Sequence, residues 1–417
     1  MYMDLDVLVD LDTGSSDLYL YNYVDGLLDS ARTYPTLNPS NLTINYGIGS
    51  VTGNVSLVDM TFAGFSVTNQ SFLHVTQSDQ TAIIDGKLAA GLLGLGFDTI
   101  SNIHDLVQSK FPGTTEGRTL LSNIFSSNPP TSRHIAFRLD RLYDNNDTDT
   151  GSFDIGTFET GFEAVKNTPE IPIYSVLPGY KIYWSVLVDG ISINGKNQTL
   201  KSAITNGNIP PDGKLAASLD TGYSYPQVTR EIAAAIYEPM DGVFDDAIGY
   251  YLVPCKAQTN LTFYIGGHTI PIHPLDLSSV GVASLDGQNV TVCRGYFQPI
   301  SGKPAGGLVD IILGDAFLRN TYTVYNFGNL TDGTSGLSSQ NPYIKLLPLT
   351  DPNAASAEFQ AARKTQLATL PPEVGDDSPD SRSALSNKSE RTAKEVTRIG
   401  SMSLAVSILC GITSFIF

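Results

Sequence analysis

Basic residues are scarce in this 417-residue chain. It has 25 Lys and Arg residues against 42 Asp and Glu residues, which gives a formal net charge of −17. Proteins that bind nucleic acid neutralise its phosphates with a basic surface, so this balance argues against nucleic acid as a partner. The remaining composition, 41% hydrophobic and 16% charged, is typical of a globular protein long enough for two domains.

The sequence also lacks the common motifs of metal sites and serine nucleophiles. Its five histidines form no His-Glu-x-x-His pattern and do not pair with the cysteines, and no Gly-x-Ser-x-Gly elbow occurs. The acidic stretch at 144–154 departs from the EF-hand order and has no closing glutamate, so we interpret it as a hairpin loop. The sequence therefore predicts neither a metal site nor a cofactor.

Only three cysteines are present, and Cys410 lies apart from the others in an apolar C-terminal tail. Nine Asn-x-Ser/Thr sequons are spread along the chain, which is typical of a protein of the secretory pathway. In that compartment we expect Cys255 and Cys293 to form a disulfide, which would stabilise the fold by roughly 4 kcal/mol. Two reduced buried thiols are the alternative. The sequons start at Asn41, Asn54, Asn69, Asn146, Asn197, Asn260, Asn289, Asn329 and Asn387.

Long hydrophobic runs are missing at both ends. Residues 1–10 have neither the basic segment nor the apolar core of a signal peptide, so we expect the natural start to lie upstream of Met1. Residues 401–417 are apolar but shorter than the about 20 residues of a spanning helix. A polar spacer and a small-residue site precede them, which is the pattern of a GPI-attachment signal at Asn387 or a neighbouring serine. A short tail anchor is the alternative.

Short strand patterns bounded by Gly, Asn, Asp and Pro fill residues 7–347. The alternation over 43–67 predicts a hairpin. Helical patterns are few and short, and they lie at 101–111, 120–125 and 226–240. The fold class is therefore predicted to be mainly all-β.

The composition changes after Leu347, where Ser, Ala, Pro and charged residues dominate. This composition predicts a disordered stalk, within which a short helix around 353–366 is possible. We divide the chain into four segments. They are an N-terminal lobe that is truncated at its start (1–165), a C-terminal lobe (166–347), the stalk (348–400) and the apolar tail (401–417).

An internal repeat is the most informative feature. The apolar runs at 7–20 and 214–228 each contain Asp-Thr-Gly, and an apolar-apolar-Gly segment follows each one about eighty to ninety-five residues later, at 89–97 and 308–318. Glycine at such a place lets another backbone approach closely. The repeat predicts two similar lobes that face one another, each of which offers one carboxylate.

Those two carboxylates belong to Asp12 and Asp220. Two carboxylates held roughly 3 Å apart share one proton, because both cannot ionise at that distance. One then acts as a base on water, while the protonated one polarises a carbonyl and later helps to protonate the leaving amine. Thr13 and Thr221 are expected to bond across the lobe boundary, and the glycines that follow, Gly14 and Gly222, allow the tight turns. This pattern predicts peptide hydrolysis without a covalent intermediate.

Several motifs follow one another in an order that resembles the pepsin-like aspartic proteases, from residue 7 to residue 347. They are "DTGSSDL", "INYGIGSVTG", "GLLGLGF", "YWSVLVDGISING", "LDTGYS", the spaced cysteines and "ILGDAFLRNTYTVYN". The resemblance implies two β-barrel-like lobes around a cleft for an extended peptide. It also implies that Ser15 supports the pair of aspartates, here called the dyad. Tyr46 would then be the tyrosine of the flap, the hairpin that covers the cleft, and Gly47, Ile48 and Tyr223 would contact the substrate.

The chain departs from this family in three ways. Only eleven residues precede Asp12, fewer than the family has, so a strand of the sheet between the lobes is expected to be missing. Tyr223 stands where the family has Ser or Thr, so Asp220 is expected to lose a hydrogen bond and to have an altered pKa. Tyr19 replaces the usual tryptophan, and Ile48 replaces the usual Ser or Thr.

The resemblance predicts an aspartic endopeptidase that acts on extended peptides at acidic pH. The stalk and tail resemble the GPI-anchored yapsin-like members of the family. We therefore expect a monomer held by a lipid anchor at the extracellular face of the plasma membrane or in the cell wall. The alternative is a pepsin-fold protein that binds peptide or cell-wall polymer without cleaving it.

Overall fold

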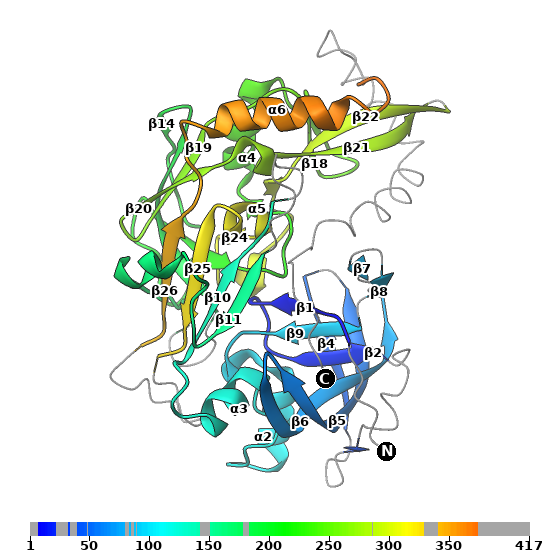
Figure 1. The fold of residues 1–417 in the computed structure, drawn as a ribbon, viewed down its shortest axis with the longest axis vertical. Helices are drawn as coiled ribbons and strands as arrows, with labels where there is room; N and C mark the ends of the chain where they lie inside the picture. The colour runs from blue at the N-terminus through cyan, green and yellow to red at the C-terminus, as the bar shows by residue number, and fades with distance from the viewer. Residues whose placement is uncertain are drawn as a thin grey trace.

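Two lobes built mainly from β-strands make up the computed structural model, and this confirms the predicted fold class (Figure 1). The N-terminal lobe contains the blue and cyan strands, and the C-terminal lobe contains the green and yellow ones. The structure describes residues 7–21, 32–33, 40–47, 49–79, 83–84, 87–88, 90–141, 151–177, 183–285, 287–328 and 341–373.

The N-terminal lobe has a seven-stranded sheet in the order β1-β9-β2-β6-β5-β3, with β4 paired to β5. The β4–β5 hairpin lies in the segment for which the sequence predicted one, and the helices α2 and α3 confirm the patterns at 101–111 and 120–125. Ser101 and Thr119 begin these helices, because each hydroxyl accepts a hydrogen bond from a backbone N–H of the first turn. The elements are β1 (Val9–Asp12), β2 (Leu18–Tyr21), β3 (Arg32–Thr33), β4 (Asn41–Asn45), β5 (Ser50–Phe62), β6 (Phe65–Ser78), β7 (Ile83–Ile84), β8 (Lys87–Leu88), β9 (Gly91–Gly94), η1 (Asp98–Ile100), α2 (Asn102–Lys110) and α3 (Leu120–Ser127).

The C-terminal lobe has an eight-stranded sheet in the order β20-β19-β13-β15-β24-β16-β23, with β14 paired to β13, and a smaller sheet in the order β17-β18-β22-β21. The helical pattern at 226–240 forms α4 and η3, while Gln227 and Val228 before it pair as a strand. The elements are β13 (Ser185–Ile193), β14 (Lys196–Asn197), β15 (Leu215–Leu219), β16 (Gln227–Val228), α4 (Arg230–Tyr237), η3 (Glu238–Met240), β17 (Val243–Asp245), β18 (Tyr250–Val253), β19 (Leu261–Ile265), β20 (His268–Ile272), η4 (Pro274–Asp276), β21 (Ser278–Leu285), β22 (Gln288–Gly295), β23 (Gln298–Pro299), η5 (Pro304–Gly307), β24 (Ile311–Leu313) and α5 (Asp315–Leu318).

A third sheet takes strands from both halves of the chain, in the order β11-β10-β25-β26-β12. Trp184 adds a second connection, because its indole N–H donates to the backbone oxygen of Leu95 at 3.1 Å and its ring packs on Phe97. The strand expected to be missing from this sheet would precede Val7, outside the described residues. The elements here are β10 (His134–Arg138), β11 (Ser152–Ile155), η2 (Glu163–Asn167), β12 (Ile171–Pro172), β25 (Thr321–Asn326) and β26 (Tyr343–Pro348).

The internal repeat of the sequence is a repeat of structure. β1 pairs in parallel with β9, and β15 pairs in parallel with β24. A Cβ atom placed on Gly94 would lie 2.4 Å from the backbone nitrogen of Ser16, and one on Gly314 would lie 1.7 Å from the backbone oxygen of Tyr223. Both glycines therefore permit the close backbone approach that the repeat predicted.

Residues 348–373 differ from the expected disordered stalk. The helix α6 (Ala355–Leu367) contains the short helix expected around 353–366, and it packs on the C-terminal lobe (Figure 1). Its buried face carries Phe359, 1% exposed, and Ala362, which cluster with Leu275. Apolar residues three apart on one helix face account for this packing. The rest of the stalk, Asn387, Cys410 and the apolar tail lie outside the described residues.

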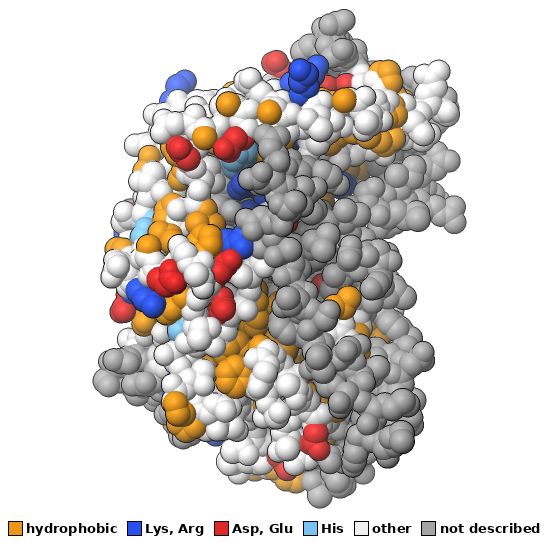
Figure 2. Space-filling model, viewed as in Figure 1, with side chains coloured by type: hydrophobic (Ala, Val, Ile, Leu, Met, Phe, Trp, Pro, Cys, Tyr) orange, Lys and Arg blue, Asp and Glu red, His pale blue; other side chains and the backbone are white. Residues whose placement is uncertain are grey.

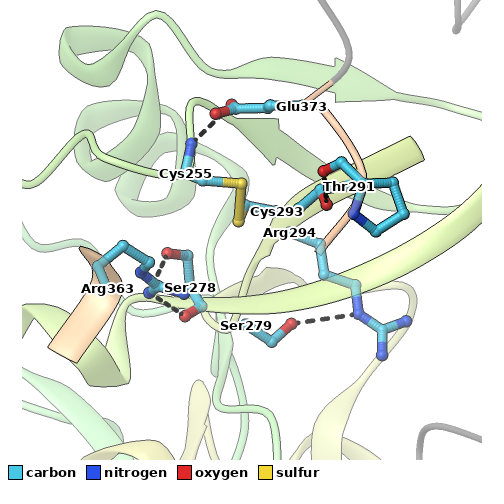
Figure 3. Close-up of a disulfide and its surroundings, with 9 residues drawn as sticks. Cys255, Ser278, Ser279, Thr291, Cys293, Arg294, Arg363 and Glu373 are labelled. Carbon is cyan, nitrogen blue, oxygen red and sulfur yellow. Dashed lines mark hydrogen bonds between the residues drawn. A yellow bond between two sulfur atoms is a disulfide. The ribbon is translucent and has the colours of Figure 1, made fainter. Parts of the chain in front are cut away.

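The last described residues are hydrogen-bonded beside a disulfide. Cys255 and Cys293 are bonded, as expected, and the backbone N–H of Cys255 donates to the carboxylate of Glu373 at 2.8 Å (Figure 3). Thr291 donates its hydroxyl to the backbone oxygen of Pro371 and its N–H to that of Pro372. The segment after α6 is therefore part of the C-terminal lobe.

Acidic and basic side chains lie interspersed over the upper lobe on the face that Figure 2 shows. Among the described residues, no helix is both long and apolar enough to cross a membrane. In the same part of the chain, no group of three or more His, Cys, Asp or Glu side chains is arranged to hold a metal ion.

Candidate active site

Asp12 and Asp220 lie at the ends of β1 and β15, and each is only 6% exposed. A Cβ atom placed on Gly14 would lie 2.1 Å from Asp220 Oδ2, and one on Gly222 would lie 2.4 Å from Asp12 Oδ1. Each carboxylate therefore packs against the glycine of the opposite turn, and any side chain there would displace it. The structure brings together the two aspartates of the repeat.

Two threonines join the turns. The backbone N–H of Thr13 donates to the hydroxyl of Thr221 at 3.0 Å, and the backbone N–H of Thr221 donates to the hydroxyl of Thr13 at 3.0 Å. Each hydroxyl then donates across the boundary, Thr13 to Leu219 and Thr221 to Leu11. All four bonds are buried. They fix the backbone immediately after each aspartate.

The hydrogen bonds to the two aspartates are unequal. Asp12 accepts from the backbone N–H of Gly14 at 2.7 Å and from the hydroxyl of Ser15 at 2.5 Å. Asp220 accepts from the backbone N–H of Gly222 at 2.9 Å, and no hydroxyl of the described residues donates to it. Ser15 therefore contacts one carboxylate of the pair, whereas among the described residues Asp220 accepts from a backbone N–H and from no side-chain hydroxyl.

This inequality decides which aspartate ionises first. Burial raises the pKa of Asp12, but hydrogen bonds from Ser15 and Gly14 oppose that rise. Burial and then the charge of Asp12 raise the pKa of Asp220 well above its ordinary value. The hydrogen bond between the two carboxyl groups favours an ionised Asp12 and a protonated Asp220. The pair therefore holds one proton over a range of pH.

Two further acids lie near the dyad, the half-buried Asp10 and the buried Asp315, and no sequence pattern had singled out either of them. Burial and the charge of Asp12 raise the pKa of Asp10 to about 7, and its Oδ1 is buried without a hydrogen-bond partner. Burial likewise raises the pKa of Asp315 to about 7, although Arg319 opposes it. The available signal for Asp10 was its place two residues before Asp12 on one strand.

Asp17, also missed, orders the helix that follows the N-terminal glycine segment. Its carboxylate accepts from the hydroxyl of Ser101, from the backbone N–H and side-chain amide of Asn102, and from the backbone N–H of Ile103. An Asp in "DTGSSDL" gives no sign by itself that its partners lie more than eighty residues away.

The hairpin between β4 and β5, here called the flap hairpin, carries Tyr46 and Gly47. The backbone N–H of Tyr46 donates to the oxygen of Gly49 at 2.9 Å, and the Tyr46 ring contacts that of Tyr19 edge-on at 5.8 Å. A Cβ atom placed on Gly47 would lie 1.8 Å from the phenol oxygen of Tyr223. The structure therefore brings Tyr223 to the flap hairpin. Ile48 lies outside the described residues.

Three comparisons with known proteins agree with this geometry. A family model described as "Eukaryotic aspartyl protease" matches residues 4–336. Major aspartyl peptidase 1 of Cryptococcus neoformans is 24% identical over 361 residues, 81% of this chain and 68% of that protein. Vacuolar protease A of Aspergillus fumigatus is 28% identical over 334 residues, 76% of this chain and 72% of that protein.

The solved structure of an aspartic proteinase from Irpex lacteus has a similar fold. It aligns with a TM-score of 0.54 and 20% sequence identity, over 83% of this chain and 91% of that one. At this sequence identity, the alignment supports the bilobal fold and nothing further.

Proposed function

This chain belongs to the eukaryotic aspartyl protease family, and we propose that it is an endopeptidase in which Asp12 and Asp220 are the catalytic pair. The observation that carries the proposal is the reciprocal packing of each carboxylate against the glycine of the opposite turn. Two buried carboxyl groups in contact retain one proton between them, as general acid–base hydrolysis requires. Acidic pH keeps that proton bound.

The unequal hydrogen bonds assign a role to each aspartate. Ionised Asp12 removes a proton from a water molecule, whose oxygen bonds to the carbonyl carbon of the scissile peptide. Asp220 gives its proton to the carbonyl oxygen, which forms a tetrahedral intermediate. When the C–N bond breaks, Asp12 returns its proton to the leaving nitrogen, and Asp220 recovers a proton from the collapsing intermediate. The enzyme regains its single shared proton, and one water has been added.

An extended peptide is the substrate that this arrangement fits. Gly47 has no side chain, so its backbone groups remain open to a neighbouring main chain. Tyr46 packs on Tyr19 beside the dyad, and its hydroxyl is buried without a hydrogen-bond partner. We assign Tyr46, Gly47 and Ile48 to the covering hairpin of the substrate site.

The test is an assay of the full chain on an acid-denatured protein at about pH 4, with and without pepstatin. We expect cleavage that pepstatin abolishes, and a loss of at least about a thousandfold in D12N and in D220N. D189N is the matched control, because Asp189 pairs with Lys214 away from the dyad. Absence of cleavage between about pH 3 and pH 7 would instead favour the non-cleaving peptide or wall-polymer binder.

We also propose that the protein is a secreted, GPI-anchored glycoprotein of the yapsin-like type, and monomeric. The described sequon asparagines are all exposed, as carbohydrate attachment requires: Asn41, Asn54, Asn69, Asn197, Asn260 and Asn289. The disulfide fits an oxidising compartment. A phosphatidylinositol-specific phospholipase is expected to release the protein from membranes. Persistence in the detergent phase would favour a tail helix, and size-exclusion chromatography tests the monomer.

A further inference from the structure

Tyr223 lies between the dyad and the flap hairpin, and we propose that it determines which substrates this protease accepts. Its ring takes up space beneath Gly47 that a peptide side chain would otherwise enter. The enzyme therefore selects substrates with a small residue, Gly, Ala or Ser, at that one position. This inference rests on the proposed function, because it concerns the substrate of the same site.

The backbone of Tyr223 is held in place. Its carbonyl oxygen accepts a hydrogen bond from the N–H of Asp315 at 2.8 Å, and its own N–H donates to the oxygen of Asp220 at 3.3 Å. Gly314 packs directly on that carbonyl, where an added Cβ would lie 1.7 Å away. Movement of this residue out of the substrate path is therefore limited to rotation of its side chain.

The side chain reaches the opposite half of the molecule. A Cβ atom on Gly47 would lie 1.8 Å from Tyr223 Oη and 2.9 Å from Cζ. The ring is half-buried, and burial followed by the charges of Asp220 and Asp12 raises the pKa of its phenol. The ring therefore lies at the flap hairpin, while the backbone of the same residue is hydrogen-bonded to that of the catalytic Asp220. A peptide that lies between the flap hairpin and the dyad would therefore contact the Tyr223 ring.

The contact with Gly47 is steric. No hydrogen bond joins the Tyr223 phenol to any described residue, so the ring acts through its volume. Where the resemblance predicts Ser or Thr, a tyrosine adds a whole aromatic ring. When two substrates differ by one methylene group in such a pocket, their kcat/KM values differ by about 10- to 200-fold.

The experiment profiles cleavage of a peptide library by the wild type, Y223T and Y223F, with sites read by mass spectrometry. We expect one position at which the wild type accepts only small residues and Y223T accepts Leu or Phe. For a peptide pair that differs only there, Ala against Leu, Y223T should raise the Leu-to-Ala ratio of kcat/KM by at least about tenfold. Y223F keeps the ring and should keep the wild-type ratio.

Binding separates this inference from the proposed function. The same peptide pair is titrated calorimetrically into D12N and into D12N/Y223T, so that no cleavage is needed. An affinity ratio that shifts toward Leu in the double variant supports the inference even if the wild type cleaves nothing. Unchanged ratios in both cleavage and binding overturn it even if the enzyme is active. If Y223T does not fold, Y223S makes the same comparison.

Discussion

Thr13 and Thr221 bond to each other twice across the boundary between the lobes, each through its backbone N–H to the hydroxyl of the other at 3.0 Å. Because each threonine directly follows a dyad aspartate, this exchange fixes the two carboxylates relative to one another. The dyad is therefore positioned by neighbours that carry no charge.

Replacement of Thr221 by valine should weaken both stability and catalysis. The variant T221V keeps the shape of the side chain but leaves the buried N–H of Thr13 without its acceptor and the oxygen of Leu11 without its donor. We expect a loss of about 2–4 kcal/mol in the free energy of unfolding, measured with denaturant. We also expect kcat to fall by about a hundredfold, because small displacements of catalytic groups are costly. T221S retains the hydroxyl, so we expect it to keep most of the wild-type stability and most of the wild-type kcat. Equal losses in T221V and T221S would contradict a role for the Thr221 hydroxyl in positioning the dyad.

Asp10 should make the fold less stable as the pH rises. Its pKa is raised to about 7 in the folded state from 3.8, so between these values the native chain binds a proton that the unfolded chain has lost. Stability from this group is therefore present below about pH 4 and is lost as the pH rises toward 7, at up to about 1.4 kcal/mol per pH unit.

The variant D10N carries no ionisable group, so it should stabilise the protein at about pH 7 and have little effect at about pH 4. Denaturant unfolding at both values measures this difference. D212N, at an exposed loop position, is the control. The same change in stability at both pH values would contradict a raised pKa of Asp10 in the folded protein.

The alkaline limb of the pH–rate profile should depend on Tyr223. That limb follows the loss of the last shared proton, chiefly from Asp220, whose pKa lies well above its ordinary value. A threonine at position 223 would offer a hydroxyl to ionised Asp220 and would lower its pKa. We expect the limb of Y223T to move to lower pH, and that of Y223F to stay in place. A limb that does not move in Y223T would show that the missing hydroxyl leaves the dyad unaffected.

The segment after Leu349 should contribute to the stability of the C-terminal lobe. A chain that ends at Leu349 loses the burial of Phe359, worth about 1.5–3 kcal/mol, and the two hydrogen bonds from buried Arg363 to Ser278. We expect a lower Tm for it than for a chain that ends at Glu373, which keeps all these contacts. Reduction of the Cys255–Cys293 disulfide should also be faster in the shorter chain. Equal Tm values and reduction rates would mean that α6 is dispensable.

Much of the site was predictable because its signals are local and occur twice. Asp-Thr-Gly after an apolar run specifies a strand, a tight turn and a carboxylate at that turn, whichever lobe contains it. The paired glycine segments indicated where a second backbone would approach, and the parallel pairs β1–β9 and β15–β24 confirm it. Repetition of one pattern was enough to place Asp12 opposite Asp220.

The features that the sequence did not predict depend on contacts between segments that are distant in the chain. A local sequence pattern contains no information about such contacts. A polar composition suggested a stalk after Leu347, yet one apolar face on α6 finds a surface to cover. The charge of Asp10 gave no sign that one of its carboxylate oxygens, Oδ1, would be buried without a hydrogen-bond partner. The sequence by itself determined the chemistry of the dyad, because that chemistry follows from the presence of two carboxylic acids. Only the tertiary structure decided that Tyr223 reaches Gly47, because a steric contact exists only once both lobes are in place.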